Sequence, residues 1–310
     1  MIPQRNQTLV TEFILLGLTD SHEQELILFG VFLIIYLMTL TGNMLIIVTV
    51  SIFPIFNTPM YFFLRNLSFL DICFTSTTVP KMLMNFLAQV KTISFIGCIT
   101  QMYSFIALGS VECILLAVMT YDRYVAICKP LHYTTIMNRT VCMLLAAASW
   151  SLACLNSLIH TALAFRLPFC GSNQINHFFC DIPPLLELAC ADTSVNEIMI
   201  YSSGGSVIVG SCFFILLSYI YIISAIIKIR STEGRLKAFS TCASHLTVVG
   251  LFFGTAIFTY IRPTSTYSLD QDRVIPVLFG IVTPMLNPMI YSFRNKEVHG
   301  ALRKLFSKKK

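Results

Sequence analysis

Seven long apolar runs with few charges constrain this chain more than any other feature of its sequence. A run of about 20 apolar residues crosses a bilayer as an α-helix, because a helix satisfies its own backbone hydrogen bonds where no water is present. The second run is the most polar, with Arg65 and Lys81 near its ends and Asp71 inside it. The predicted spans are residues 26–50, 60–86, 98–121, 140–165, 198–227, 238–261 and 274–293.

The composition supports a chain that lies mostly in the membrane. Of the 310 residues, 55% are hydrophobic and only 12% are charged, with a mean hydropathy of +0.75. A soluble domain carries roughly twice that charged fraction. Uniformly apolar runs also exclude an outer-membrane barrel, whose strands alternate. We predict an all-α integral membrane protein, a seven-transmembrane helix bundle at 26–293, with an N-terminal arm at 1–25 and a tail at 294–310.

Lysine and arginine set the orientation, because they are enriched in cytoplasmic loops. With the N-terminus outside, six of the 21 Lys and Arg residues fall on the outer face and the other 15 on the inner face. We therefore predict an extracellular N-terminus and a cytoplasmic C-terminus. The net charge of +6 does not by itself indicate nucleic acid, and we expect no nucleic-acid partner.

Two features are expected outside the spans. The sequon at Asn6 would lie on the glycosylated side of the membrane, and residues 1–25 lack the pattern of a cleavable signal peptide. In the tail, apolar residues recur at helical spacing opposite basic ones, which predicts a short amphipathic helix on the inner leaflet that contacts membrane lipid. Its apolar positions are Val298, Ala301, Leu302, Leu305 and Phe306.

Four of the eleven cysteines fall on the outer side, Cys98 at the start of the third span and Cys170, Cys180 and Cys190 in a long loop at about 166–197. That compartment oxidises thiols, and four cysteines permit three pairings. The residues alone do not choose among them. A zinc site that includes His177 is the alternative, but the ligand spacing matches no common structural site.

Two acids lie inside spans, Asp71 and Glu112. Each costs roughly 2.5–3.5 kcal/mol at a helix centre, so both should face the bundle interior. If they lie close together, they need a cation or a shared proton. A sodium ion or a protonated pair is the functional hypothesis, and a neutral acid hydrogen-bonded to a neighbouring helix is the alternative.

An acid and a base, Asp122 and Arg123, stand at the inner end of the third span. An arginine beside an aspartate can be held by a salt bridge in one state and freed in another. The alternative is a plain positively charged anchor at the membrane face. The sixth span carries His245, which we interpret as a packed polar contact near the inner end; a group that reports pH is the alternative.

The seventh span contains a proline kink. Pro288 removes a backbone hydrogen bond, and we expect Asn287 to satisfy the group that the kink frees. A kinked helix with Asn287 and Tyr291 near its inner end suits a part that moves, although a static kink would have the same sequence.

Five motifs together resemble the olfactory receptors, a branch of the rhodopsin-like G-protein-coupled receptors. They are PMYFFL from Pro59, MTYDRYVAIC from Met119, the pair Ser218-Tyr219, KAFSTCASHL from Lys237 and PMLNPMIY from Pro284. They run from the first inner loop to the last span, so the resemblance covers nearly the whole chain. The long cysteine-bearing loop is similar to that of the tetrapod-type class.

The resemblance implies roles for individual residues. Cys98 would pair with Cys180, and Cys170 with Cys190. Arg123 would be held by Asp122 at rest, next to Tyr124, and would face the G protein in the active state. Tyr219 and Tyr291 would then swing towards Arg123, and Asp71 and Glu112 would match a sodium pocket. The implied ligand-binding residues are Phe105, Ile106, Gly109, Ser110, Ile182, Ser203, Val207, Phe253, Ile257 and Tyr260.

The implied function is an odorant receptor that binds small volatile, mostly apolar molecules and activates a stimulatory olfactory G protein, raising cyclic AMP. It would act in the plasma membrane of sensory cilia, with a trafficking chaperone as a further partner and with no cofactor other than the sodium ion. Because the predicted ligand-binding residues carry no full charge, the pattern argues against amine ligands. The inner face departs from the family pattern at Phe56-Asn57, Arg65 and Thr120, which puts coupling strength in question.

Two other classes of function fit the sequence less well. A transporter or channel would favour repeated halves or a polar ring through the core, and the seven spans show no internal repeat. A membrane enzyme would need a nucleophile or a metal motif, and the chain has neither a zinc-protease His-Glu pattern nor a Gly-x-Ser-x-Gly turn.

Overall fold

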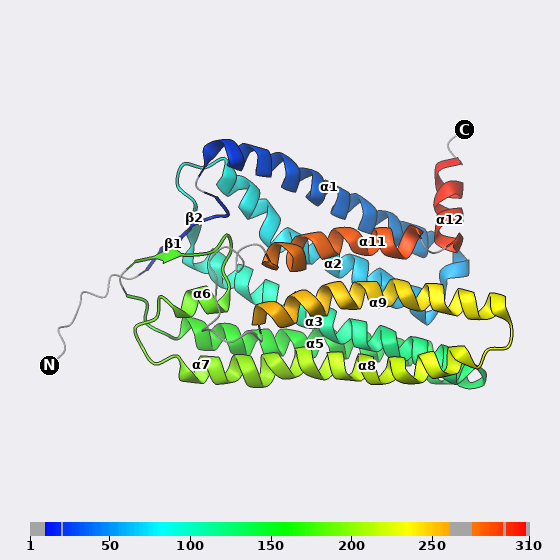
Figure 1. Ribbon diagram of the computed structural model, residues 1–310. Helices are drawn as coiled ribbons and strands as arrows, with labels where there is room; N and C mark the ends of the chain where they lie inside the picture. The colour runs from blue at the N-terminus through cyan, green and yellow to red at the C-terminus, as the bar shows by residue number, and fades with distance from the viewer. Residues whose placement is uncertain (1–9, 20, 171, 261–274, 294–295, 308–310) are drawn as a thin grey trace.

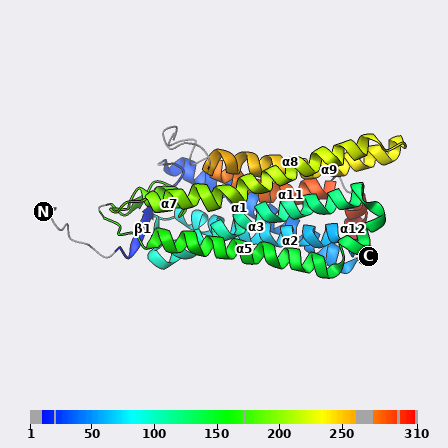
Figure 2. The ribbon, with the colours of Figure 1, turned by 90° about the horizontal axis from the view of Figure 1, so that it is seen from below.

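The protein is a bundle of long helices, seen in a computed structural model that describes residues 10–19, 21–170, 172–260, 275–293 and 296–307 (Figures 1 and 2). The helices that cross the bundle are α1 (His22–Ile52), α2 (Pro59–Phe86), α3 (Phe95–Cys128), α5 (Arg139–Phe165), α8 (Gly205–Ile227), α9 (Thr232–Tyr260) and α11 (Thr283–Phe293). Two of them are extended by π-helical turns. The turn η3 (Ile200–Gly204) joins α7 (Ser194–Met199) to α8, and η5 (Leu278–Val282) leads into α11.

The predicted seven-helix bundle is confirmed, and the helices run past the predicted spans. Within the described ranges, five segments are long and apolar enough to cross a membrane, and residues 275–291 form a shorter apolar helix. α2 has the length but carries three charged side chains. α3 continues to Cys128 and α9 begins at Thr232, beyond the predicted limits of 121 and 238. The spans were estimated from apolar composition, whereas a helix continues into water wherever its backbone bonds are kept.

α3 lies at the centre of the bundle and packs against α2, α5 and α8. Half of its apolar segment is buried, compared with 22% for α1 and for the α7–α8 segment. The outward faces of the peripheral helices present large apolar side chains, among them Ile27, Ile34 and Phe213. Such faces are unfavourable in water and suit contact with lipid, which fits a multi-pass membrane protein.

A small sheet closes one end of the bundle. Strand β1 (Glu12–Leu15) pairs antiparallel with β2 (Thr92–Ser94) and parallel with β3 (Gln174–Ile175). We call this end, which also carries both disulfides, the sheet end, and the opposite end the α12 end (Figure 1). The sequence predicted only an arm over residues 1–25. Within it, residues 12–15 form the middle strand of the sheet and α1 already begins at His22, ahead of the predicted span limit of 26.

The long loop between α5 and α7 folds over the sheet end. Disulfides join Cys98 to Cys180 and Cys170 to Cys190, as the family resemblance implied. The loop contains β3 and the short helix α6 (Ile182–Leu186). A second hydrophobic cluster, separate from the main core, forms where the loop, β1 and the start of α3 meet.

At the other end, α12 (Lys296–Ser307) lies across the bundle (Figure 1). Val298 and Ala301 are buried, whereas Arg303 and Lys304 are exposed, which confirms the predicted amphipathic helix for these positions. Short helical turns cover the same end, η1 (Pro54–Phe56), η2 (Pro130–His132) and α4 (Tyr133–Ile136). The predicted glycosylation site Asn6 and the last three lysines lie outside the described residues.

Candidate functional site

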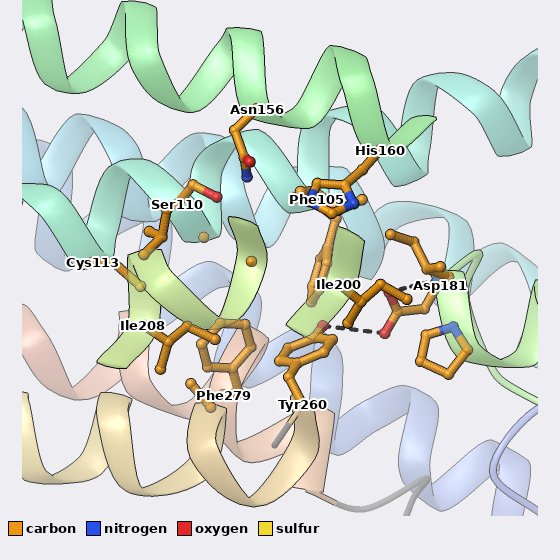
Figure 3. Close-up of a pocket in the computed structure, with 17 residues that line it drawn as sticks. Phe105, Ser110, Cys113, Asn156, His160, Asp181, Ile200, Ile208, Tyr260 and Phe279 are labelled. Carbon is orange, nitrogen blue, oxygen red and sulfur yellow. Dashed lines mark hydrogen bonds between the residues drawn. The ribbon is translucent and has the colours of Figure 1, made fainter. Parts of the chain in front are cut away.

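A cavity of about 90 Å³ lies near the sheet end, between α3, α5, η3, α8, α9 and η5 (Figure 3). Its wall is mainly apolar, with Phe105, Ile208 and Phe279 contributing large side chains. α6 closes the cavity on the side of the long loop through Ile182 and Pro183. Seven of the ten predicted ligand-binding residues line it, namely Phe105, Ile106, Gly109, Ser110, Ile182, Val207 and Tyr260.

The other three predicted residues lie off the wall. Ala256 and Tyr260 of α9 line the cavity four residues apart. Ile257 is turned by about 100° from Ala256 and is 37% exposed on the outer face, as the helical period requires. Phe253 lies nearly one turn below Ala256, buried against Phe252. Ser203 sits behind the wall, where its hydroxyl is hydrogen-bonded to His160 Nε2 at 2.8 Å.

Polar side chains that were not predicted also line the cavity, and Asp181 is the most important (Figure 3). It caps α6, because its Oδ1 accepts a hydrogen bond from the Ile182 N–H at 2.8 Å. Its Oδ2 accepts one from the Tyr260 hydroxyl at 3.1 Å. Burial raises the pKa of the Asp181 carboxyl to about 6, opposed by these two hydrogen bonds. The expectation of a ligand site without a full charge was therefore wrong.

The sequence held a signal for Asp181. It directly follows Cys180 and precedes Ile-Pro-Pro, which is the pattern of a helix cap followed by an early proline. His160 and Asn156 gave no comparable signal, because a lone polar residue in an apolar span is as readily a packing contact. His160, Asn156 and Ser110 line the cavity from α5 and α3 (Figure 3).

Gln101 fixes the long loop over the cavity. Its Oε1 accepts a hydrogen bond from the Cys180 N–H at 2.9 Å, and its Nε2 donates to the Thr77 carbonyl at 3.1 Å. Together with the disulfide to Cys98, these bonds hold the chain just before Asp181 against α3. One hydrogen bond and one disulfide thus tie the ceiling of the cavity directly to α3.

Aromatic rings separate the cavity from a polar cluster deeper in the bundle. Phe105 contacts Phe74, Phe179 and Phe279, with ring centroids 4.5 to 5.9 Å apart. Phe279 also packs on Phe252 of α9. Contiguous packing through the main core therefore connects the cavity wall with Tyr219 and Tyr291, two of the residues predicted to move at the α12 end.

The polar cluster joins Asp71 of α2, Glu112 of α3 and Asn287 of α11. Asn287 Nδ2 donates to both Asp71 carboxylate oxygens, each at 3.1 Å. Glu112 lies beside Asp71 and Asn287, but both of its carboxylate oxygens and the Asn287 Oδ1 are buried without a hydrogen bond of normal geometry among the described residues. Unpartnered buried carboxylate oxygens are costly, and they are the ligands that a hard cation prefers. The donor set therefore fits a sodium ion.

The proline kink in α11 is satisfied differently from the prediction. Pro288 frees the carbonyl of Pro284, and Asn43 of α1 donates to that carbonyl at 3.1 Å. Asn287 was expected in this role but bonds Asp71 instead. The side chains of adjacent residues on a helix diverge by about 100°, so Asn287 faces α2 while the freed carbonyl faces α1.

At the α12 end, Asp122 and Arg123 have separate partners. Asp122 Oδ1 accepts a hydrogen bond from the Tyr133 hydroxyl at 2.8 Å, and Arg123 Nη1 donates to the Thr241 carbonyl at 3.1 Å. The described residues contain no ion pair between them. The expected Asp122–Arg123 pairing was wrong for this state, because consecutive helical residues point to different neighbours. Arg123 ties α3 directly to α9.

The remaining predicted switch residues lie around Arg123. Tyr219 of α8 and His245 of α9 are buried and hydrogen-bonded at 2.9 Å, which confirms His245 as a packed polar contact. The buried Tyr291 hydroxyl has no partner among the described residues. Tyr124 is half-buried against Tyr221. A second cavity of about 480 Å³ opens beside Asp122, Arg123 and Thr241.

Comparison with known proteins identifies the class of receptor. The sequence profile of the olfactory receptor family matches residues 32–309. The chain is 50% identical to mouse olfactory receptor 5AR1 over 306 residues, which is 99% of both chains. It is 52% identical to human olfactory receptor 5G3 over 306 residues, covering 99% of this chain and 98% of that one. Human olfactory receptor 1F1 is 52% identical over 300 residues, covering 97% and 96%. The chain therefore belongs to the olfactory receptor family, whose members are odorant-sensing G-protein-coupled receptors and not enzymes.

Proposed function

We propose that the cavity at the sheet end binds small volatile, mostly apolar odorants that carry one hydrogen-bonding group. A mainly apolar wall with a few convergent polar side chains carries this proposal. The cavity measures about 90 Å³, whereas a cavity of about 150 Å³ accommodates benzene. Odorants with a six-membered ring or larger therefore require a wall side chain to move as they bind.

The polar part of the wall favours ligands that donate a hydrogen bond. The carboxylate of Asp181 only accepts once it is ionised, and its pKa of about 6 leaves it mostly ionised at neutral pH. An alcohol donates to Asp181 and accepts from another polar group of the wall, such as the Ser110 hydroxyl or the Asn156 amide. A protonated amine can pair with the Asp181 carboxylate. Amines were excluded because the predicted ligand-binding residues carry no full charge, and Asp181 removes that reason. Matched ethers and hydrocarbons, which cannot donate, should bind more weakly.

Activation follows from the contacts at the α12 end. The bond from Arg123 to the Thr241 carbonyl holds α9 against α3. A ligand that binds better to the arrangement with α9 displaced shifts the population towards it. Arg123 then becomes free to contact a stimulatory olfactory G protein in the cavity beside it, which raises cyclic AMP. In this proposal the N-terminus lies outside the cell, and α12 lies at the cytoplasmic face of the ciliary plasma membrane.

We also propose that Asp71, Glu112 and Asn287 hold a sodium ion in the resting state. The buried, unpartnered oxygens of Glu112 and Asn287 support it. The alternative is a pair of acids that share a proton, and in either case only one net negative charge remains in the core.

The exposed basic side chains of α12 would contact anionic lipid, and a trafficking chaperone would assist transport to the surface.

The test is cyclic AMP production in cells that express this chain with the olfactory G protein. The odorant panel contains matched series of alcohol, amine, methyl ether and hydrocarbon. We expect a saturable response to at least one donor ligand, a weaker response to its ether, and no response from Arg123→Ala at matched surface expression. A response that survives in Arg123→Ala, or ethers that equal alcohols across all series, would contradict the proposal.

A further inference from the structure

We propose that the N-terminal strand β1 is a positioning element of the ligand site, with Phe13 as its central residue. This inference rests on the proposed function, because it concerns the same cavity. Residues 12–15 lie outside the membrane-spanning helices and line no described cavity, so nothing in their sequence points to the ligand. Their contacts do.

β1 is the middle strand of the sheet and binds two loops that are far apart in the chain (Figure 1). The Ile14 N–H donates to the Asn173 carbonyl at 2.9 Å, and the Leu16 N–H to the Ile175 carbonyl at 3.0 Å, which fixes the long loop. The Leu15 N–H donates to the Lys91 carbonyl at 2.8 Å, which fixes the loop before α3. β2 and β3 have no direct pairing, so β1 alone joins them in the sheet.

Phe13 anchors the strand through its side chain, which is fully buried. Its ring contacts Phe95 at the start of α3 at 5.9 Å and Phe169 of the long loop at 5.6 Å. Both of those rings also contact Phe165 at the end of α5. Four aromatic rings from β1, α3, α5 and the long loop thus form one unit, and pairs of this kind contribute beyond their buried area.

The same cluster reaches the cavity wall. Phe13 and Leu15 belong to one buried group with Cys180 and Ile182, and Ile106 packs against it. Ile182 and Ile106 line the ligand cavity. β3 lies only a few residues before Asp181, so the strand pairing sets the direction in which the chain enters the cavity ceiling.

Two supports therefore hold the ceiling. Gln101 and the Cys98 disulfide fix Cys180 from the side of α3. β1 fixes the loop from the outside. Without Phe13 the disulfide still restrains Cys180, so we expect a looser ceiling and not an unfolded one. Ligand affinity should fall because the bound position of Ile182 and Asp181 becomes less populated before binding.

The first arm of the test needs neither ligand nor G protein. A receptor carrying Ile182→Cys is treated on intact cells with a membrane-impermeant thiol reagent. The rate of labelling is compared between Ile182→Cys alone, Ile182→Cys with Phe13→Ala, and Ile182→Cys with Glu12→Ala. Ile182 is 7% exposed, so slow labelling is expected with Phe13 intact. Phe13→Ala should raise the rate several-fold. Glu12→Ala, an exposed neighbour on the same strand, should not, and the parent chain without Ile182→Cys gives the background.

The second arm measures odorant concentration–response curves at matched surface expression. Phe13→Ala should raise the half-maximal concentration by about three- to tenfold, the range typical of coupling mutations remote from a ligand. A role in folding alone predicts fewer receptors at the surface with an unchanged half-maximal concentration and unchanged labelling, and that result would overturn the proposal. If Phe13→Ala is retained inside the cell, Phe13→Leu and Ile14→Pro, which removes the donor to Asn173, are measured in both arms.

The two arms separate the failure of this inference from failure of the proposed function. Faster labelling in Phe13→Ala with no odorant response from the parent receptor would leave the positioning role standing and remove the ligand assignment. If the parent receptor responds to odorants, and labelling and half-maximal concentration are unchanged in every β1 variant, the ligand assignment stands and the positioning role is removed.

Discussion

Asp181→Asn should stabilise the receptor at neutral pH, although it removes a charge that is hydrogen-bonded twice. The pKa of this carboxyl rises from its usual 3.8 to about 6 because the group is buried. The folded protein therefore binds the proton more tightly than the unfolded chain does. The stability that this carboxyl contributes is fully present below pH 3.8 and is lost as the pH rises through about 6. The asparagine keeps the acceptor for the Ile182 N–H and remains within hydrogen-bonding distance of the Tyr260 hydroxyl.

The magnitude follows from the two pKa values. A difference of about two pH units corresponds to about 3 kcal/mol, at 1.36 kcal/mol per unit. At about 2.1 cal/mol/K per residue, unfolding 310 residues carries an entropy of about 0.65 kcal/mol/K, so that energy corresponds to a change in melting temperature of about 5 °C. Parent and variant should therefore melt together near pH 4, and the variant should melt higher above pH 6.

The assay is thermal unfolding of purified receptor in detergent at pH 4, 5, 6 and 7.5, followed by tryptophan fluorescence. Asp192→Asn is the control, because this acid lies in the same loop but is exposed, and hydrogen bonds from Ser194 lower its pKa. Its pH dependence should have the opposite sign. Parallel curves for the parent and Asp181→Asn across the whole range would refute the argument that burial of Asp181 raises its pKa.

Three further predictions concern the cavity, its ceiling and the polar cluster. Gly109→Val should weaken odorant potency by about tenfold, because a Cβ at this position already touches Phe279 at 3.5 Å and the two methyl groups of valine would fill part of the cavity that Gly109 lines. Gly250→Val, whose Cβ meets nothing within 4 Å, should have no effect in the same cyclic AMP assay. Gln101→Leu should lower stability by about 1–3 kcal/mol in thermal unfolding, because it leaves the buried Cys180 N–H unsatisfied. Replacing sodium by a large organic cation should lower the melting temperature of the parent receptor but not of Glu112→Gln, and equal sensitivity in both would contradict the sodium site.

The sequence predicted the architecture well because the relevant signal is local. Each membrane span is encoded by its own apolar run, and the motifs around Arg123 and Pro288 lie within single helices. The family resemblance supplied the disulfide pairing, which spacing left open. Seven of the predicted ligand-binding residues line the cavity, six of them on the inward faces of helices and Ile182 in the long loop, and their role in binding stays a prediction.

The contacts that could not be predicted join residues far apart in the chain. β1 is only four residues long, and its partner strands begin 80 and 162 residues later, so its sequence alone gives little indication of pairing. Asn43 reaches the Pro284 carbonyl across 241 residues. Asp122 and Arg123 are adjacent, which suggested a salt bridge, but their directions are set by Tyr133 and Thr241 on other elements. Position along a helix does not reveal these partners.

The π-helical turns η3 and η5 have an evolutionary consequence. Both contribute to the cavity wall, through Ile200 and Gly204 on one side and Phe279 on the other. A π-helical turn holds one residue more than an α-helical turn. Deleting one codon there would let the helix close into α-helical form and would rotate the neighbouring side chains by about 100°. We expect such deletions to present a new set of side chains to the odorant while the rest of the bundle stays in register. Length changes of this kind would alter odour tuning in one mutational step.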